Sequence, residues 1–395
     1  MNAQNDQNDP APADRPEADP LTDPLAQLAD PADHISRRAG WTEPVPVSFT
    51  GSGSEYFRIW IVNLLLMLVT LGIYYPWAKA RRLRYFHANT RIGEHAFSFH
   101  GEGGSMLRGF AVVGVLLVAV SLVGELSLAL GLMAVGLFVV AGPMLLRLSL
   151  QFRLSQTRWR GLRFSFDGTL REAVWASALA LAFLWCVLVA PMLERWAKEQ
   201  PDGIANMLTG GLGIVLLCLM PFLPVAHRSL LAYRQGHIRY AGASSSFSAT
   251  VGAFYAPIAK CVLAGIVVGL LSLAVTSPFL MLPLGAATWV LCLAIWHAGI
   301  QNAVWSSTRL PQVDLHSRLD TAALAWRYLL NGLGLVVTLG LYWPFAAVAT
   351  ARLRLAAVTV SFGPDFERGL ADPVQAVDDA RGDAAADLAG LDLGL

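Results

Sequence analysis

Long apolar runs alternate with short polar stretches through most of the chain. Almost no charge, apart from Glu125, occurs in residues 106–146, 175–192, 207–225, 261–275, 279–296 and 333–342. A helix needs about 20 apolar residues to cross a bilayer core, and these runs meet or approach that length with their flanks. A backbone in lipid must satisfy its own hydrogen bonds, so helices are expected. The pattern predicts an all-α polytopic membrane protein with about eight hydrophobic helical segments.

Composition supports this prediction and marks off both ends. Of the 395 residues, 55% are hydrophobic and 14% are charged, whereas soluble domains carry about 25% charged residues. Residues 1–44 are rich in Asp, Pro and Ala, and residues 361–395 repeat Asp, Ala and Gly. Such segments bury little apolar surface, so we expect two disordered acidic tails around a transmembrane domain at 45–360. Residues 1–30 lack the pattern of a cleaved signal peptide.

A repeated unit begins where the first apolar run ends. The spacing from Pro76 to the Gly of Phe97-Ser-Phe-His-Gly101 recurs from Pro143 to the Gly of Phe164-Ser-Phe-Asp-Gly168. Thr157-Arg158 follows Thr90-Arg91 by the same number of residues as Pro143 follows Pro76. A third, weaker copy and the remnant of a fourth lie at Pro224, Tyr233, Arg239, Phe247 and at Thr308-Arg309. Several matches at one offset indicate an internal repeat.

A second match joins the two ends of the domain. Thr70-Leu71-Gly72, with Tyr74 and Pro76 after it, recurs as Thr338-Leu339-Gly340 with Tyr342 and Pro344. Asn63 and Asn331 keep the same offset. We therefore expect the first and last hydrophobic segments to have the same orientation.

The segment Leu71-Gly-Ile-Tyr-Tyr-Pro-Trp-Ala-Lys-Ala-Arg-Arg82, followed by Thr90-Arg-Ile-Gly93 and Phe97-Ser-Phe-His-Gly101, resembles the YjgN-like inner-membrane protein family. The resemblance covers roughly residues 45–360 and is strongest at 47–110. It implies a multi-pass protein of the bacterial inner membrane. It implies no substrate and no catalytic residue.

The distribution of Lys and Arg predicts the topology. Basic residues crowd the loops after the first, third, fifth and seventh segments, and the intervening turns carry little net positive charge. Because Lys and Arg favour the cytoplasmic side, all the repeat loops belong there. Eight spans would leave Arg352 and Arg354 outside, while re-entrant first and last segments would leave six central spans and two cytoplasmic tails. Both topologies stay open from the sequence.

The Phe-x-Phe-x-Gly segments alternate apolar and polar residues, which is a strand period. Residues 90–99 read as a hairpin with Gly93-Glu94 at a two-residue turn, where a leading Gly suits type II′ geometry. We expect small cytoplasmic β elements packed between helix ends.

Aromatic and basic side chains follow the first segment at the expected membrane surface. They would either serve as an aromatic belt and topology signal or bind anionic lipid head groups. The candidate interfacial, lipid-facing residues are Tyr74, Tyr75, Pro76, Trp77, Lys79, Arg81, Arg82, Arg84, Arg91 and Arg158.

Three polar residues lie within apolar segments. Asn63 and Asn331 would either join helices by hydrogen bonds or line a pore. Glu125 fits a turn between two spans or, less economically, a proton relay. They are the candidate polar intramembrane residues.

The sequence predicts no metal site, no cofactor and no enzyme chemistry. His87, His95 and His100 share one loop, but a strand there would point His95 and His100 to opposite faces. The cysteines lie singly in apolar runs, where packing is the expected role. No phosphate loop or nucleophile elbow occurs, and no nucleic-acid partner is expected.

Two functions of different class remain open from the sequence. One is a small-solute transporter or channel, because internally repeated helical proteins often transport. The other is a non-transporting scaffold that binds lipid or a partner. The first predicts a polar cavity lined by Asn63, Asn331 or Glu125, and the second predicts packed helices with a basic face at head-group level. The bilayer is the expected partner in both, and the oligomeric state is open.

Overall fold

The structure is a computed structural model that describes residues 40–198, 203–274 and 277–370. Most of the two expected tails therefore lies outside the described residues. Within these three ranges the chain repeats one unit five times: a strand, a pair of packed helices and a second strand.

The first, second and fifth units have simple boundaries. The first holds β1 (Val45–Phe49), α2 (Gly53–Val69), α3 (Tyr75–Ala88) and β2 (Thr90–Ile92). The second holds β3 (His95–Phe99), α4 (Gly103–Leu126), α5 (Leu128–Ser155) and β4 (Thr157–Trp159). The fifth holds β11 (Val313–Ser317), α11 (Thr321–Val337), α12 (Trp343–Ala356) and β12 (Val358–Phe362), and α13 (Phe366–Leu370) follows it.

The third and fourth units each start with an interrupted strand. The third holds β5 (Leu162–Arg163), β6 (Ser165–Phe166), α6 (Leu170–Lys198), α7 (Ile204–Leu219), the 3₁₀ turn η2 (Met220–Phe222), α8 (Leu223–Gly236) and β7 (Ile238–Tyr240). The fourth holds β8 (Ala243–Ser244), β9 (Ser246–Phe247), α9 (Gly252–Ala274), α10 (Pro278–Ser307) and β10 (Thr308–Leu310).

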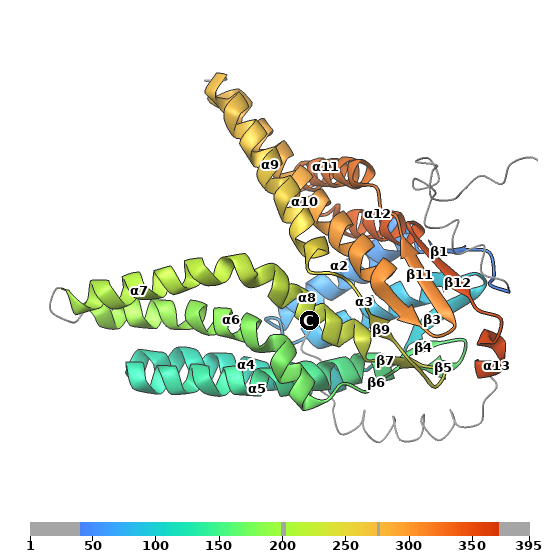
Figure 1. The fold of residues 1–395 in the computed structure, drawn as a ribbon, viewed down its shortest axis with the longest axis horizontal. Coiled ribbons are helices and arrows are strands. Elements are labelled where there is room, and N and C mark those ends of the chain that lie inside the picture. Colours follow the sequence, from blue (N-terminus) through green and yellow to red (C-terminus); the bar gives the residue numbers. More distant parts are fainter. Residues whose placement is uncertain (1–39, 199–202, 275–276, 371–395) are drawn as a thin grey trace, which may run out of the picture.

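The strands close into a circle, which we call the β ring. Only Phe164 separates β5 from β6, and only Ser245 separates β8 from β9, so each pair is one bent strand. β5 pairs with β4 while β6 pairs with β7, and β8 pairs with β7 while β9 pairs with β10. The two ends meet where β1 pairs with β12, with Val45 opposite Val360. Over the described residues, a nine-stranded sheet from β5 to β9 and a three-stranded sheet of β6, β7 and β8 are thus joined through the two bent strands into one antiparallel circuit (Figure 1).

The β ring corrects the expectation of small β elements packed between helix ends. The individual hairpin at residues 90–99 is present as predicted: Ile92 lies opposite His95, and Gly93 takes a φ of +59° at the two-residue turn. What the sequence does not predict is that each hairpin also pairs with the next one. These pairings join residues far apart in the chain, so no local pattern reports them.

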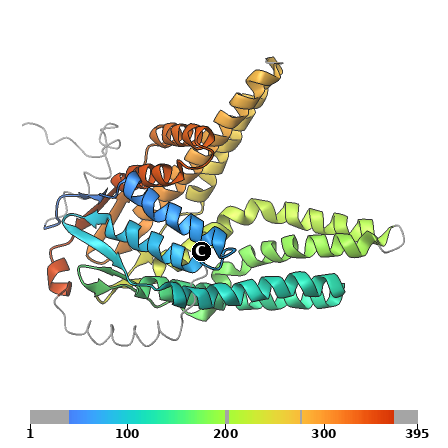
Figure 2. The ribbon, with the colours of Figure 1, turned by 180° about the vertical axis from the view of Figure 1, so that it is seen from behind.

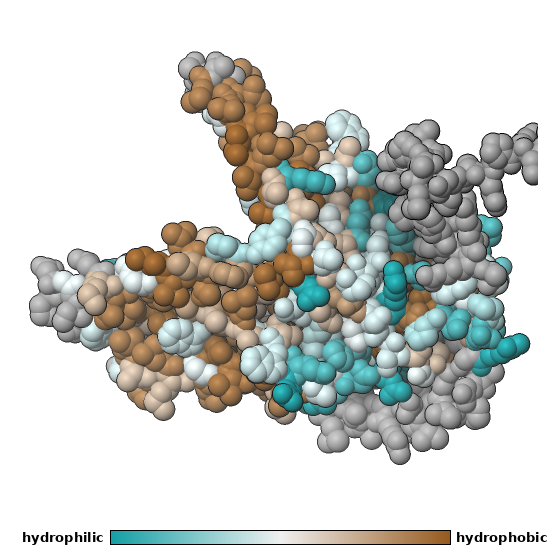
Figure 3. All heavy atoms as spheres, viewed as in Figure 1, coloured by the Kyte–Doolittle hydropathy of each residue, from teal (hydrophilic) through white to brown (hydrophobic). Residues whose placement is uncertain are grey.

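The helices project from one end of the β ring. The views in Figures 1 and 2 show α4, α5, α6 and α7 as one bundle and α9 with α10 as a separate arm. The short pairs α2 with α3 and α11 with α12 pack against each other through α2 and α12, while α3 packs on α4 of the bundle and α11 packs on α10 of the arm. Hydrophobic residues cover the projecting arms, and hydrophilic residues gather over the β ring (Figure 3).

The number of spans is six, not about eight. Within the described residues, the stretches long and apolar enough to cross a membrane are 103–123, 128–155, 170–198, 207–236, 252–273 and 279–307. The first and last hydrophobic segments form α2 and α11, which have 17 residues each. A rise of 1.5 Å per residue gives them about 25 Å, less than the hydrocarbon core of about 30 Å. After each of these helices the chain reverses direction and returns to the β ring through α3 or α12.

Candidate functional site

Each helical pair meets the β ring through the same backbone hydrogen bond. The amide after the unit's opening strand donates to the carbonyl oxygen of the residue that ends the unit's last helix or directly follows it. The five pairs found in the described chain are Thr50 to Asn89 (2.9 Å), His100 to Gln156 (2.9 Å), Asp167 to His237 (3.2 Å), Ser248 to Ser307 (3.0 Å) and Arg318 to Ala357 (2.9 Å). The last two units therefore share the junction of the first two, although their sequence motifs are weak.

A second set of contacts links each unit to the next. A side chain on the second helix donates to a backbone carbonyl oxygen just before the following helix. The donors and acceptors are Arg84 to Gly101 (3.3 Å), Arg147 to Gly168 (2.9 Å), Arg228 to Ala249 (3.0 Å), Asn302 to Leu319 (3.0 Å) and Arg352 to Gly51 (2.9 Å). The Arg352 contact joins the last unit to the first. Arg84, a candidate lipid-facing residue, therefore makes a structural contact.

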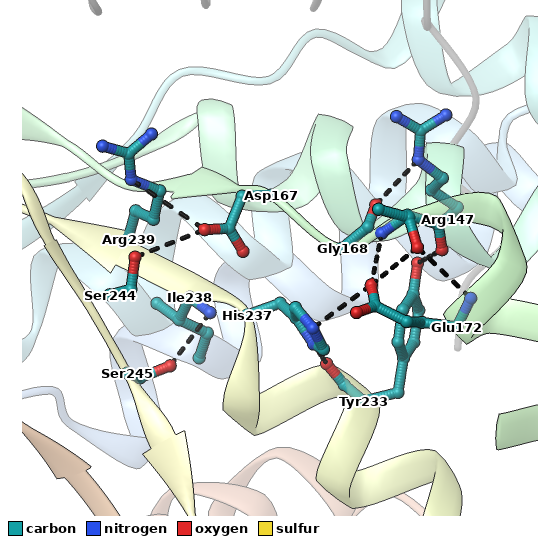
Figure 4. A network of polar contacts seen from close by, with 11 residues as sticks. Arg147, Asp167, Gly168, Glu172, Tyr233, His237, Ile238, Arg239, Ser244 and Ser245 are labelled. Carbon is teal, nitrogen blue, oxygen red and sulfur yellow. Dashed lines mark hydrogen bonds and ion pairs between the residues drawn. The ribbon is translucent and has the colours of Figure 1, made fainter.

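The third unit shows how polar side chains reinforce a junction (Figure 4). The Glu172 carboxylate accepts from the backbone N–H and the hydroxyl of Thr169, at 2.8 and 2.7 Å, in a capping box. The Tyr233 hydroxyl donates to the Thr169 carbonyl oxygen at 3.1 Å, and His237 Nε2 lies 3.3 Å from Glu172. The hydrogen-bonding groups of these residues are paired with one another around the start of α6, so the cluster forms a helix cap.

Aromatic side chains fill the inside of the β ring. Trp159 and Tyr240 are 5% and 3% exposed, and Phe97, Phe164 and Phe362 pack with them. The centroids of Phe164 and Tyr240 are 4.5 Å apart, and the Trp159 ring stacks on Phe362 at 5.8 Å. The Tyr240 hydroxyl donates to the Trp159 carbonyl oxygen at 3.0 Å. The interior is a packed core.

The helix α13 covers this core. Its Phe366 is 5% exposed and lies 4.6 Å from the Phe362 ring. Both terminal nitrogens of Arg160 contact the Glu367 carboxylate, at 2.8 and 3.0 Å, in a bidentate pair. Hydrogen bonding from Arg160 lowers the pKa of the Glu367 carboxyl below its ordinary value. Ordered structure thus continues past the expected domain boundary at residue 360.

Arginines line the outside of the β ring. Ile92, Trp159, Tyr240 and Leu310 come from four different units and share the aromatic core. Successive side chains in a strand point to opposite faces. The preceding residues therefore point outward, and they are Arg91, Arg158, Arg239 and Arg309, which we call the arginine belt. Arg91 and Arg309 are exposed, and Arg158 and Arg239 are half-buried.

The candidate residues on α3 divide into buried and exposed groups. Pro76 is buried in the first turn of the helix, Lys79 is half-buried and Tyr75 is exposed against Phe110 at 5.4 Å. Tyr74 and Trp77 stack at 5.9 Å, and the Arg81 guanidinium lies 5.8 Å from the Tyr74 ring centre. Arg82 lies 6.0 Å from the Phe86 ring. Arg81 and Arg82 are exposed.

The three polar intramembrane candidates do not come together. Asn331 is 6% exposed, and its amide donates to Thr350 Oγ1 at 3.0 Å and to the Ala346 carbonyl oxygen at 3.4 Å, both on α12. Asn63 is also 6% exposed, on α2. Glu125 lies in the last turn of α4 and pairs with Arg195 near the end of α6. Asn331 thus joins two helices, and Glu125 lies by the turn between spans.

His87, in the last turn of α3, is a packing residue. His87 Nδ1 lies 2.7 Å from the Leu83 carbonyl oxygen, and its ring packs on Phe99 at 5.3 Å. Burial lowers the pKa of His87, which favours the neutral ring. No group of three or more His, Cys, Asp or Glu side chains in the described part of the chain is arranged to hold a metal ion.

Comparison with known proteins agrees with the membrane location that the apolar helices indicate. The model of a family described as "Bacterial protein of unknown function (DUF898)" matches residues 44–388. The chain belongs to this family. It is 29% identical over 180 residues to "Inner membrane protein YjgN" of Salmonella typhimurium, covering 45% of this chain and 44% of that protein.

A second relative agrees. "Inner membrane protein YjgN" of Escherichia coli K12 is 32% identical over 137 residues, which cover 33% of each chain. The alignments thus span less than half the length of these relatives. No solved structure matches the chain. Together with the six apolar helices among the described residues, the relatives identify an integral, multi-pass protein of the bacterial inner membrane.

Sequence reasoning missed the aromatic core of the β ring and the contacts between units. One signal was available. Trp159 and Tyr240 each follow an arginine of the repeat, as Ile92 and Leu310 do. An apolar residue recurring directly after an outward-facing arginine marks the inner face of a strand.

Proposed function

We propose that this protein is a non-transporting membrane scaffold that binds anionic lipid head groups through the arginine belt and is not an enzyme. The observation that supports it most is the β ring itself, which is packed with aromatic side chains inside and carries arginines outside. The ring lies at the end of the helices where basic residues concentrate. Lys and Arg near an anionic surface gain about 1 kcal/mol each.

The alternative, a small-solute transporter or channel, needs a polar path between helices. Two grooves between the described helices are apolar. One of about 580 Å³ lies among α5, α6 and α7 and includes Pro143 and Trp185, and one of about 390 Å³ lies between α9 and α10 and includes Trp289. Asn63, Asn331 and Glu125 line neither. This arrangement favours lipid contact over solute passage.

A lipid-binding experiment tests the proposal. The purified protein is placed in vesicles of phosphatidylcholine with increasing phosphatidylglycerol, and tryptophan quenching by head-group-labelled phosphatidylglycerol is measured. The variant Arg91→Gln with Arg309→Gln should lower the apparent affinity about 30-fold, from about 1 kcal/mol per arginine. Lys198→Gln is the control, because Lys198 is exposed at the opposite end of α6.

A flux experiment separates the two functions. Vesicles that contain the protein should retain entrapped small solutes as well as protein-free vesicles do. Efflux that depends on the protein and is abolished by Asn331→Leu would contradict the scaffold proposal and support transport. Equal quenching in wild type and in the Arg91, Arg309 variant would contradict head-group binding by the arginine belt.

A further inference from the structure

The two short helical pairs reverse direction through the same turn. Leu71 and Gly72 take φ values of +49° and +90°, and Leu339 and Gly340 take +51° and +92°. In each pair a threonine fixes the turn. Thr70 Oγ1 accepts from the Tyr74 amide at 3.1 Å, and Thr338 Oγ1 accepts from the Tyr342 amide at 2.9 Å. Both reversals are therefore built by hydrogen bonds within the pair.

Among the described residues, no neighbouring segment covers the apolar side chains at these two turns. Leu71 is 93% exposed and Leu339 is 94% exposed. Adjacent aliphatic residues are also exposed: Val69, Ile73, Val336, Val337 and Leu341. A continuous apolar tip on each pair needs an apolar environment.

Charge along these helices marks how deep the tips can lie. Counting from the tip, the first charged residues are Lys79, eight residues from Leu71, and Arg352, thirteen from Leu339. On the outgoing helices, Arg58 and Arg327 are at thirteen and twelve residues. At 1.5 Å per residue these charges lie about 12–20 Å from the tips, within or close to half of a hydrocarbon core of about 30 Å.

The order of side chains matches one leaflet. Behind each apolar tip comes a stacked aromatic pair, Tyr74 with Trp77 at 5.9 Å and Tyr342 with Phe345 at 5.6 Å. The arginines follow. Acyl chains, interface and head groups of a single leaflet succeed one another in this order.

The two pairs also form one body. α2 packs on α12, where Phe57 and Phe345 lie 5.8 Å apart. A Cβ on Gly53 would lie 2.4 Å from the Phe345 ring, so the helices approach closely there. Arg352 adds its hydrogen bond to the Gly51 carbonyl oxygen. The two pairs are thus joined along α12 and the first turns of α2.

We propose that α2, α3, α11 and α12 form a wedge that enters only the leaflet facing the β ring and binds its acyl chains with the two tips. The protein then occupies more area in that leaflet than in the opposite one. The wedge does not depend on head-group binding by the arginine belt, because its tips carry no charge.

Fluorescent depth measurements test the wedge. In a variant with Ala in place of Cys186, Cys218, Cys261 and Cys292, a single cysteine at Leu71 or Leu339 is labelled with an environment-sensitive dye and placed in vesicles with brominated acyl chains. We expect the strongest quenching by bromines near the chain ends. The matched controls are Ser54→Cys, at the base of α2, and Ser127→Cys, at the turn between α4 and α5.

Each result bears on the proposal. A membrane-impermeant thiol reagent added on the side that labels Ser127→Cys should leave Leu71→Cys and Leu339→Cys unlabelled. Labelling from that side would mean that the segments span the bilayer, and it would overturn the wedge. Quenching of the dye by an aqueous quencher on the side of Ser54→Cys would mean that the tips lie outside the bilayer, which would overturn it as well.

Discussion

Trp159→Ala should destabilise the protein strongly, because the indole occupies the centre of the β ring. The side chain is 5% exposed, and its ring lies 6.0, 5.7 and 5.8 Å from those of Phe97, Tyr240 and Phe362. Its Nε1 donates to the His95 carbonyl oxygen at 3.2 Å. The substitution removes contacts with three units at once.

The size of the effect follows from burial. Truncating a core Phe or Trp to Ala costs about 3–5 kcal/mol, and the lost hydrogen bond adds about 1 kcal/mol. The free energy of unfolding should therefore fall by about 4–6 kcal/mol. For a chain of this size each kcal/mol shifts the melting temperature by about 2 °C, so the apparent melting temperature should fall by about 8–12 °C.

Intrinsic-fluorescence melting of the detergent-purified protein measures the change, and near-UV circular dichroism checks the aromatic packing. Trp175→Ala is the matched control: it makes the same truncation on α6, where Trp175 is 74% exposed, and should shift the melting temperature little. If Trp159→Ala and Trp175→Ala melt together, the β ring has no packed aromatic interior and the reasoning fails.

Two further predictions concern a helix contact and an ion pair. A Cβ on Gly103 would lie 2.4 Å from Trp77 Cδ1 and 2.8 Å from its Cα, whereas one on Gly104 meets nothing within 4 Å. Gly103→Ala should therefore lower the melting temperature by several degrees, and Gly104→Ala should leave it unchanged or raise it; equal effects would contradict the close packing of α3 on α4. Glu367→Gln removes the ion-pair partner of Arg160. Because the Glu367 side chain is 70% exposed, the substitution should lower the free energy of unfolding by less than about 1 kcal/mol. Because the folded-state pKa of Glu367 is lowered, this stabilisation is present above its ordinary value of 4.5 and is lost as pH falls through the lowered pKa. The difference in melting temperature between wild type and Glu367→Gln should therefore shrink as pH is lowered from 5, and a difference that does not change down to the lowest pH at which both proteins fold would contradict it.

Much of the local structure could be predicted from sequence. The apolar runs indicate the helices, and the match between Thr70-Leu71-Gly72 and Thr338-Leu339-Gly340 indicates the shared turn. The two-residue turn at Gly93 follows from glycine's access to positive φ. These features depend on residues close together in the chain.

The β ring could not be predicted in the same way. Its bent strands contribute segments of two residues, such as β5 and β8, which are too short to show a period. Closure depends on Val45 meeting Val360, a contact between the two ends of the domain. The number of spans also needed the structure, because the sequence does not show that the chain reverses at residues 71–72 and 339–340, which limits α2 and α11 to 17 residues each.

Helix length, rather than the junction with the β ring, therefore sets how each unit meets the bilayer. The first, second and fifth units share the same amide-to-carbonyl hydrogen bond at the β ring, and its N···O distance is 2.9 Å in all three. Yet α4 and α5 have 24 and 28 residues, whereas α2 and α11 have 17. At 1.5 Å per residue the longer helices cover about 36–42 Å and the shorter ones about 25 Å. Lengthening α2 and α3 by two turns each, with apolar residues, should convert the first unit into a spanning pair and leave its junction intact. Thiol labelling of a cysteine at the new tip from the side of Ser127→Cys would then succeed, where labelling at Leu71→Cys in the parent does not.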